Sequence, residues 1–140
     1  MVYFLQNLVN ALQWGSFYAL IALGYSMVYG VLLLFNFAHG DIFMVGAYIG
    51  FFVASGVLLL VSALGLVSLP GWLLLVVIIL VSMFLTSFVG MAVERIGYRP
   101  LRSAPRASAA ITGLMIGITL ETGNLALLGA TRLSFPTLIE

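Results

Sequence analysis

Four long apolar tracts, separated by short polar or proline-containing segments, account for most of this chain. No Asp, Glu, Lys or Arg precedes Asp41, and none lies between Asp41 and Glu94. A helix needs about 20 predominantly apolar residues to cross the hydrocarbon core of a bilayer, and the tracts are long enough. The pattern predicts four membrane-spanning helices with approximate spans 9–35, 42–62, 72–93 and 107–131.

The composition agrees with this pattern and defines the class of protein. The chain is 64% hydrophobic and only 6% charged, whereas a soluble domain is about 25% charged. The tracts also lack the alternation of apolar and polar residues that is typical of barrel strands. We therefore expect an all-α membrane protein, with a single transmembrane domain over residues 1–140 that forms a polytopic helix bundle.

Small residues recur every four positions in several of the tracts. Gly46 and Gly50 have this spacing in the second tract, and Gly113 and Gly117 have it in the fourth. Small residues on one helical face let two helices approach closely, although Gly and Ala are also common in membrane helices generally. We expect these four glycines to be helix-packing positions.

The segment 94–106 differs from the rest of the chain because it is basic and contains prolines. Proline interrupts helices, and basic residues next to a membrane span favour the cytoplasmic side. We therefore expect a cytoplasmic loop, preceded by three spans that place the N-terminus outside. Docking of a cytoplasmic partner is the second interpretation of the same charges. The arginines expected to orient the chain are Arg95, Arg99, Arg102 and Arg106.

One short polar stretch, Asn36–Asp41, interrupts the apolar pattern between the first two tracts and contains the only histidine, His39. Two interpretations stay open. In the first, the stretch is a turn in which Asn36 takes a left-handed conformation and Asp41 caps the next helix. In the second, Asn36, His39 and Asp41 line a substrate path or gate, as interrupted helices do in transporters.

A single acid, Glu121, lies near the middle of the fourth tract. A charged acid at the centre of a span costs about 3 kcal/mol, while the apolar residues of this tract favour insertion by about 2.4–4.8 kcal/mol. The two terms nearly cancel, so the helix depends on its neighbours. Because Glu121 follows Gly117 by four residues, we expect it to face the bundle. A packing role and a path-lining role both stay open.

The sequence contains no pattern that is typical of enzyme chemistry. It has one histidine and no cysteine, which argues against a zinc site. It also lacks a nucleotide-binding glycine loop and a nucleophile–base pair. We expect no catalytic residue, no bound cofactor and no metal.

Two groups of residues resemble a known family. The first is the run Ala19–Gly30, followed by Asn36–Asp41 and by Met44–Tyr48. The second comprises Val93-Glu94-Arg95 and Tyr98-Arg99-Pro100-Leu101-Arg102. In this order they closely resemble the permease subunits of branched-chain amino acid ABC importers, the LivH type.

The resemblance implies a multi-pass permease subunit in the inner membrane of a bacterium. It would form part of the pathway for branched-chain or other hydrophobic amino acids delivered by a periplasmic binding protein. The implied partners are a second permease subunit and two cytoplasmic ATPases, which would hydrolyse ATP; nucleic acid is not among them. Family members are much longer, so we interpret the chain as the N-terminal part of a larger permease fold. The alternatives are a urea or short-amide permease, and a truncated membrane protein without transport function.

Overall fold

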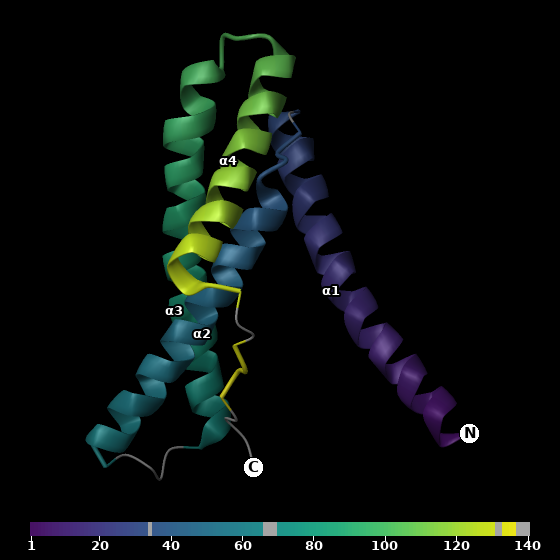
Figure 1. Ribbon diagram of the computed structural model, residues 1–140, viewed down its shortest axis with the longest axis vertical. Helices are drawn as coiled ribbons and strands as arrows, with labels where there is room; N and C mark the ends of the chain where they lie inside the picture. The colour runs from purple at the N-terminus through teal and green to yellow at the C-terminus, as the bar shows by residue number, and fades with distance from the viewer. Residues whose placement is uncertain (34, 66–69, 131–132, 137–140) are drawn as a thin grey trace.

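The computed structural model describes residues 1–33, 35–65, 70–130 and 133–136, with side chains except those of Val31, Leu32 and Arg106. Within these ranges the chain is helical and contains no strand, which confirms the predicted all-α class. Figure 1 shows the course of the chain. The elements are α1 (Val2–Leu32), α2 (His39–Ala63), α3 (Gly71–Ala92), the π-helical turn η1 (Val93–Tyr98), the 3₁₀ turn η2 (Arg99–Leu101) and α4 (Arg106–Leu128).

Helices α2, α3 and α4 lie side by side, whereas α1 approaches them only near its C-terminal end and then diverges (Figure 1). The start of α1, the end of α2 and the start of α3 lie toward one end of the molecule. The connection between α3 and α4 forms the opposite end. The helices therefore alternate in direction, as expected for a chain that crosses a membrane repeatedly.

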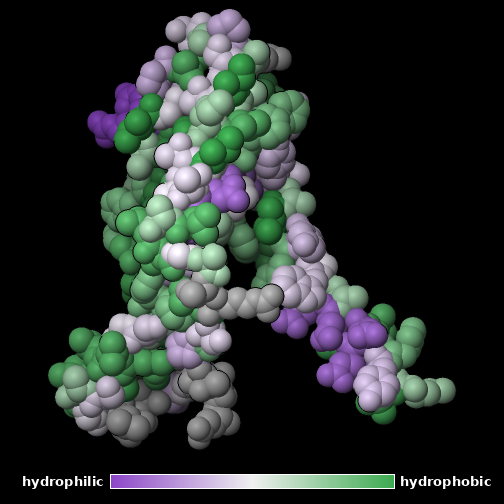
Figure 2. All heavy atoms as spheres, in the orientation of Figure 1, coloured by the Kyte–Doolittle hydropathy of each residue, from purple (hydrophilic) through white to green (hydrophobic). Residues whose placement is uncertain are grey.

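Three helical segments are long and apolar enough to cross a membrane, namely His39–Ala63, Gly71–Leu101 and Ala107–Leu128. Their mean hydropathies are 2.2, 2.8 and 1.4. Among the helices in the described ranges, α1 is long enough but falls outside this group. Figure 2 shows a hydrophilic patch on its N-terminal half, where the sequence has Gln6, Asn7, Asn10 and Gln13.

The helices pack through small residues and hydroxyls. A Cβ on Gly46 of α2 would lie 3.1 Å from the Thr86 methyl of α3, closer than a normal van der Waals contact. A Cβ on Gly50 would lie 3.8 Å from the Ser82 hydroxyl of the same helix. The Thr86 hydroxyl is itself satisfied, because it donates to the Ser82 carbonyl at 2.7 Å. Close approach of α2 and α3 therefore depends on the absence of a side chain at Gly46, whereas a Cβ on Gly50 would make an ordinary contact.

Several helix boundaries differ from the predicted ones, and α1 begins at Val2 instead of position 9. Helix α2 begins at His39, three residues before the predicted position 42, and α1 ends at Leu32 instead of reaching 35. Leu33 terminates α1 in a left-handed conformation, with φ at 52°. The fourth helix ends at Leu128, and position 131 of its predicted span lies outside the described residues.

The predicted basic loop over 94–106 is wrong for most of its length. The chain stays helical from α3 through η1 and η2, and only residues 102–105 connect η2 to α4. Pro100 does not interrupt this course because it occupies the first turn of η2, where a backbone N–H has no intrahelical partner to lose. Pro105 immediately precedes α4 in an extended conformation.

We predict that Gly46→Leu destabilises the bundle, whereas Gly56→Leu does not. A side chain at Gly46 must displace Thr86, whereas no atom lies within 4 Å of a Cβ on Gly56 in the same helix. Overpacking typically costs about 1–3 kcal/mol. Thermal unfolding in detergent, followed by circular dichroism, measures the difference. Equal loss of thermal stability in the two variants would show that α2 does not pack on α3 through Gly46.

Candidate functional site

The side chains of His39 and Asp41 point to different helices, because both residues lie in the first turn of α2. A Cβ on Gly24 of α1 would lie 2.9 Å from Nε2 of His39, so the imidazole occupies the space that this glycine leaves. The imidazole also meets the Tyr25 ring edge-on, with ring centroids 6.1 Å apart. The Asp41 carboxylate lies directly against Gly117 of α4.

Asn36 forms the third polar contact of this stretch, through its side-chain oxygen. Its Oδ1 accepts a hydrogen bond from the Ala38 N–H at 3.1 Å and another from the Tyr98 hydroxyl at 2.7 Å. Its backbone carbonyl accepts from the N–H of His39 at 3.2 Å. Asn36 thereby links the beginning of α2 to η1, at the end of the third helical segment.

These contacts correct the turn interpretation of the stretch. The left-handed residue is Leu33 and not Asn36. Asp41 does not cap α2, because the N-cap residue is Ala38 and no side chain caps the helix end. Asp41 lies in the first helical turn, where a carboxylate interacts favourably with the positive end of the helix dipole.

The Asn36–Asp41 element lies partway along the bundle and not at its end. A Cβ on Gly113 would lie 3.3 Å from the Phe37 nitrogen, and Gly117 contacts Asp41. Since α4 begins at Arg106, these glycines lie about 10 and 16 Å along its axis at ~1.5 Å per residue. The element is therefore one third to one half of the way along α4, and the start of α2 lies at the same depth.

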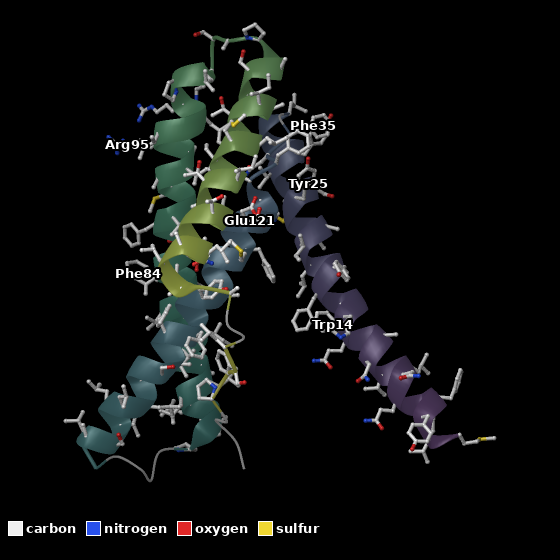
Figure 3. All side chains as sticks on the ribbon, in the orientation of Figure 1. Trp14, Tyr25, Phe35, Phe84, Arg95 and Glu121 are labelled. Carbon is white, nitrogen blue, oxygen red and sulfur yellow. The ribbon has the colours of Figure 1, made fainter. Side chains whose placement is uncertain are left out.

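Glu121 follows Gly117 by one helical turn, at the edge of α4 that lies next to α2 (Figure 3). Its side chain is exposed in this chain and lines a cavity of about 690 Å³, together with Asn124 of α4 and with Met44 and Tyr48 of α2. Gly113 and Gly117 are buried on the same face. Two carboxylates therefore lie along one side of α4. Asp41 of α2 contacts Gly117, and Glu121 lies one turn further along α4, at the cavity.

The arginines of the third helical segment lie on the surface. Arg95, Arg99 and Arg102 are exposed, and Figure 3 shows Arg95 directed away from the bundle. Nη2 of Arg102 lies 2.8 Å from Oε1 of Glu94, and the two side chains are 70% and 43% exposed. An exposed pair of this kind contributes only about 0–1 kcal/mol. Arg106 begins α4, and its side chain is outside the description.

Comparison with known proteins identifies the family of this chain. A family model described as "Branched-chain amino acid transport system / permease component" matches residues 7–134. The chain belongs to this family. No solved structure matches it.

Three relatives show how much of the permease the chain covers. It is 39% identical over 137 residues to the permease protein BraD of a high-affinity branched-chain amino acid transport system of Pseudomonas aeruginosa. It is 35% and 34% identical over 139 residues to the permease proteins LivH of Escherichia coli and Salmonella typhimurium. The matches include 98–99% of this chain but 43% of each relative. This member of the permease family therefore spans less than half the length of these relatives.

Sequence reasoning missed several residues of this candidate site, above all Tyr98. Its contact with Asn36 joins positions 62 residues apart, and η1 shifts the helical register just before it. Gly24, Tyr48 and Asn124 were also missed. Gly24 begins no four-residue repeat, and neither Tyr48 nor Asn124 is charged. Within the described part of the chain, no cluster of three acidic or histidine side chains could hold a metal ion.

We predict that Gly117→Ala destabilises the permease chain by about 1–3 kcal/mol, because the new methyl would collide with the Asp41 carboxylate. Gly123→Ala is the matched control in the same helix, since no atom lies within 4 Å of a Cβ there. It should be neutral or more stable, by up to about 1 kcal/mol. The measurement is the free energy of unfolding in detergent.

A second substitution identifies the cause of that loss. Asp41→Ala in the Gly117→Ala background should recover most of the lost stability, because the colliding carboxylate is gone. Purely additive effects of the two substitutions would contradict the contact.

Proposed function

We propose that this chain forms part of the transmembrane pathway of a bacterial ABC importer for branched-chain amino acids. The observation that carries the proposal is the family match over residues 7–134. The relatives' own names, permease proteins of high-affinity branched-chain amino acid transport systems, support the substrate class. Because the chain matches 43% of each relative, the complete pathway would need the part of the permease that this chain does not match.

The depth of the Asn36–Asp41 element supports a role in the path or its gate. Polar side chains inside a membrane protein are tolerated where they face protein or a water-filled cavity. Transporters use helices that begin within the membrane in this way, and the helix ends contribute partial charges to the site. We propose Asn36, His39, Asp41 and Glu121 as path or gate residues.

The proposed assembly contains a second permease subunit, two cytoplasmic ATPases and a periplasmic binding protein, in the inner membrane. The ATPases would hydrolyse ATP, so this chain itself would not be an enzyme. The exposed arginines near the α3–α4 connection support a cytoplasmic position for that end. With helices that alternate in direction, the end of α2 would then face the periplasm.

Single cysteines test this orientation directly, since the chain has none of its own. We predict that Ser103→Cys reacts with an impermeant maleimide only after the inner membrane is opened. Leu64→Cys, at the exposed end of α2, should react in intact spheroplasts. Reaction of both from the same side would refute the proposed orientation.

Uptake tests the proposed path residues. The chain would be joined to the remaining part of the Pseudomonas aeruginosa relative, and uptake measured per unit of inserted permease. We predict that His39→Ala and Asp41→Ala lower uptake about tenfold or more, which corresponds to one lost interaction of a charged or buried polar group. Membrane expression should fall less.

Two further variants separate a path role from a structural one. Asp41→Ser should not restore uptake, because Asp41 is not a capping residue. Glu94→Gln is the control, since it removes a carboxylate that forms only a surface ion pair. Full uptake in both His39→Ala and Asp41→Ser would reduce the element to a connecting turn.

A further inference from the structure

The π-helical turn η1 determines the direction of the Tyr98 side chain. A π-turn contains more residues per turn than an α-helix, so side chains that follow it point in a different direction from the α-helical register. Here the shift brings the Tyr98 hydroxyl to Oδ1 of Asn36, at 2.7 Å. Of the two hydrogen bonds between side chains in the described residues, this one joins positions 62 apart, whereas the other, from Arg102 to Glu94, joins positions eight apart.

Helix α4 has a glycine, Gly113, where the Tyr98 side chain passes on its way to Asn36. The Tyr98 hydroxyl occupies the space in which a Cβ of Gly113 would lie, and the ring carbon Cζ is 3.4 Å from that point. A Cβ on Gly97, within η1, would likewise collide with Ile116 of α4. The absence of side chains at Gly97 and Gly113 therefore lets η1 lie close enough to α4 for the Tyr98 hydroxyl to reach Asn36.

The acceptor of this hydrogen bond also organises the start of α2. Oδ1 of Asn36 accepts from both the Tyr98 hydroxyl and the N–H of Ala38, the N-cap residue of α2. His39 and Asp41 follow within the next turn. On the other side, Tyr98 lies in the same helical run as the exposed Arg95 and Arg99, and the exposed Arg102 directly follows this run.

We propose that Tyr98 is a positioning residue that couples the arginine-bearing segment 94–102 to the start of α2. Its hydroxyl fixes Asn36, and Asn36 fixes the first turn that carries His39 and Asp41. Movement of the segment 94–102 would therefore change the position of these two side chains. The relevance of this coupling to transport rests on the proposed function, whereas the coupling itself does not.

Hydrogen exchange in the 140-residue chain tests the coupling without any transport assay. Tyr98→Phe removes the hydroxyl and keeps the ring. It should speed exchange of the backbone amides in 36–42 roughly two- to tenfold, the effect of one lost hydrogen bond. Tyr18→Phe is the matched control, because Tyr18 is 69% exposed on α1 and should leave this exchange unchanged.

Reciprocity gives a second measurement, because a coupling free energy acts equally in both directions. Asn36→Ala should speed exchange in 94–102 by a similar factor, and adding Tyr98→Phe should increase it no further. Unchanged exchange in Tyr98→Phe, or additive effects in the double variant, would overturn the proposal.

Gly113→Ala provides an independent check. The added methyl takes the place of the Tyr98 hydroxyl, so this variant should reproduce the faster exchange in 36–42. In the Tyr98→Phe background the same change should be tolerated better, because the colliding oxygen is absent. An identical penalty in both backgrounds would mean that Gly113 accommodates the Phe37 backbone alone.

Uptake by the joined permease separates positioning from packing. Tyr98→Phe should lower the maximal rate of uptake and leave the half-saturating substrate concentration unchanged, since the hydroxyl positions residues without contacting substrate. Faster exchange with unchanged uptake would overturn the role in transport. Absence of uptake in the unsubstituted joined permease would count against the proposed function, and the exchange measurements would still decide the coupling.

Discussion

The break between α1 and α2 determines the surrounding structure, because hydrocarbon offers no hydrogen-bond partner to an interrupted backbone. The Leu33 N–H donates to the Tyr29 carbonyl at 2.8 Å. The amides of Ala38 and His39, at the start of α2, donate to the side chain and the backbone carbonyl of Asn36. A side-chain hydrogen-bond acceptor is therefore needed at position 36, since an apolar residue there would leave the Ala38 N–H at the start of α2 without this partner.

Covering this break with protein requires helices that come very close, and glycines make that approach possible. In lipid, helices associate through close packing and interhelical hydrogen bonds, and not through the hydrophobic effect. Three polar side chains around the break occupy the space left by a glycine on another helix. The pairs are His39 with Gly24, Asp41 with Gly117, and Tyr98 with Gly113.

The sequence predicts those features that follow from hydrophobicity and from an undisturbed helical period. Gly113 and Gly117 share a face with Glu121 because α4 keeps its α-helical register throughout. The direction of the Tyr98 side chain cannot be predicted from residue spacing, since the π-turn that ends at Tyr98 changes the helical register. The divergence of His39 and Asp41 follows only once α2 is known to begin at His39, where Asn36 accepts hydrogen bonds from the Ala38 and His39 amides.

The two helices that cover the break are held with different strength. Near the break, α1 contacts α2 through Gly24 and Tyr25, and the rest of α1 diverges (Figure 1). By contrast, α4 is held to the break and to η1 by Gly97, Gly113 and Gly117 together. Separating α4 would break three close contacts, while separating α1 would break the contacts of the His39 imidazole with Gly24 and Tyr25. The contacts around the break therefore hold α4 more firmly than α1.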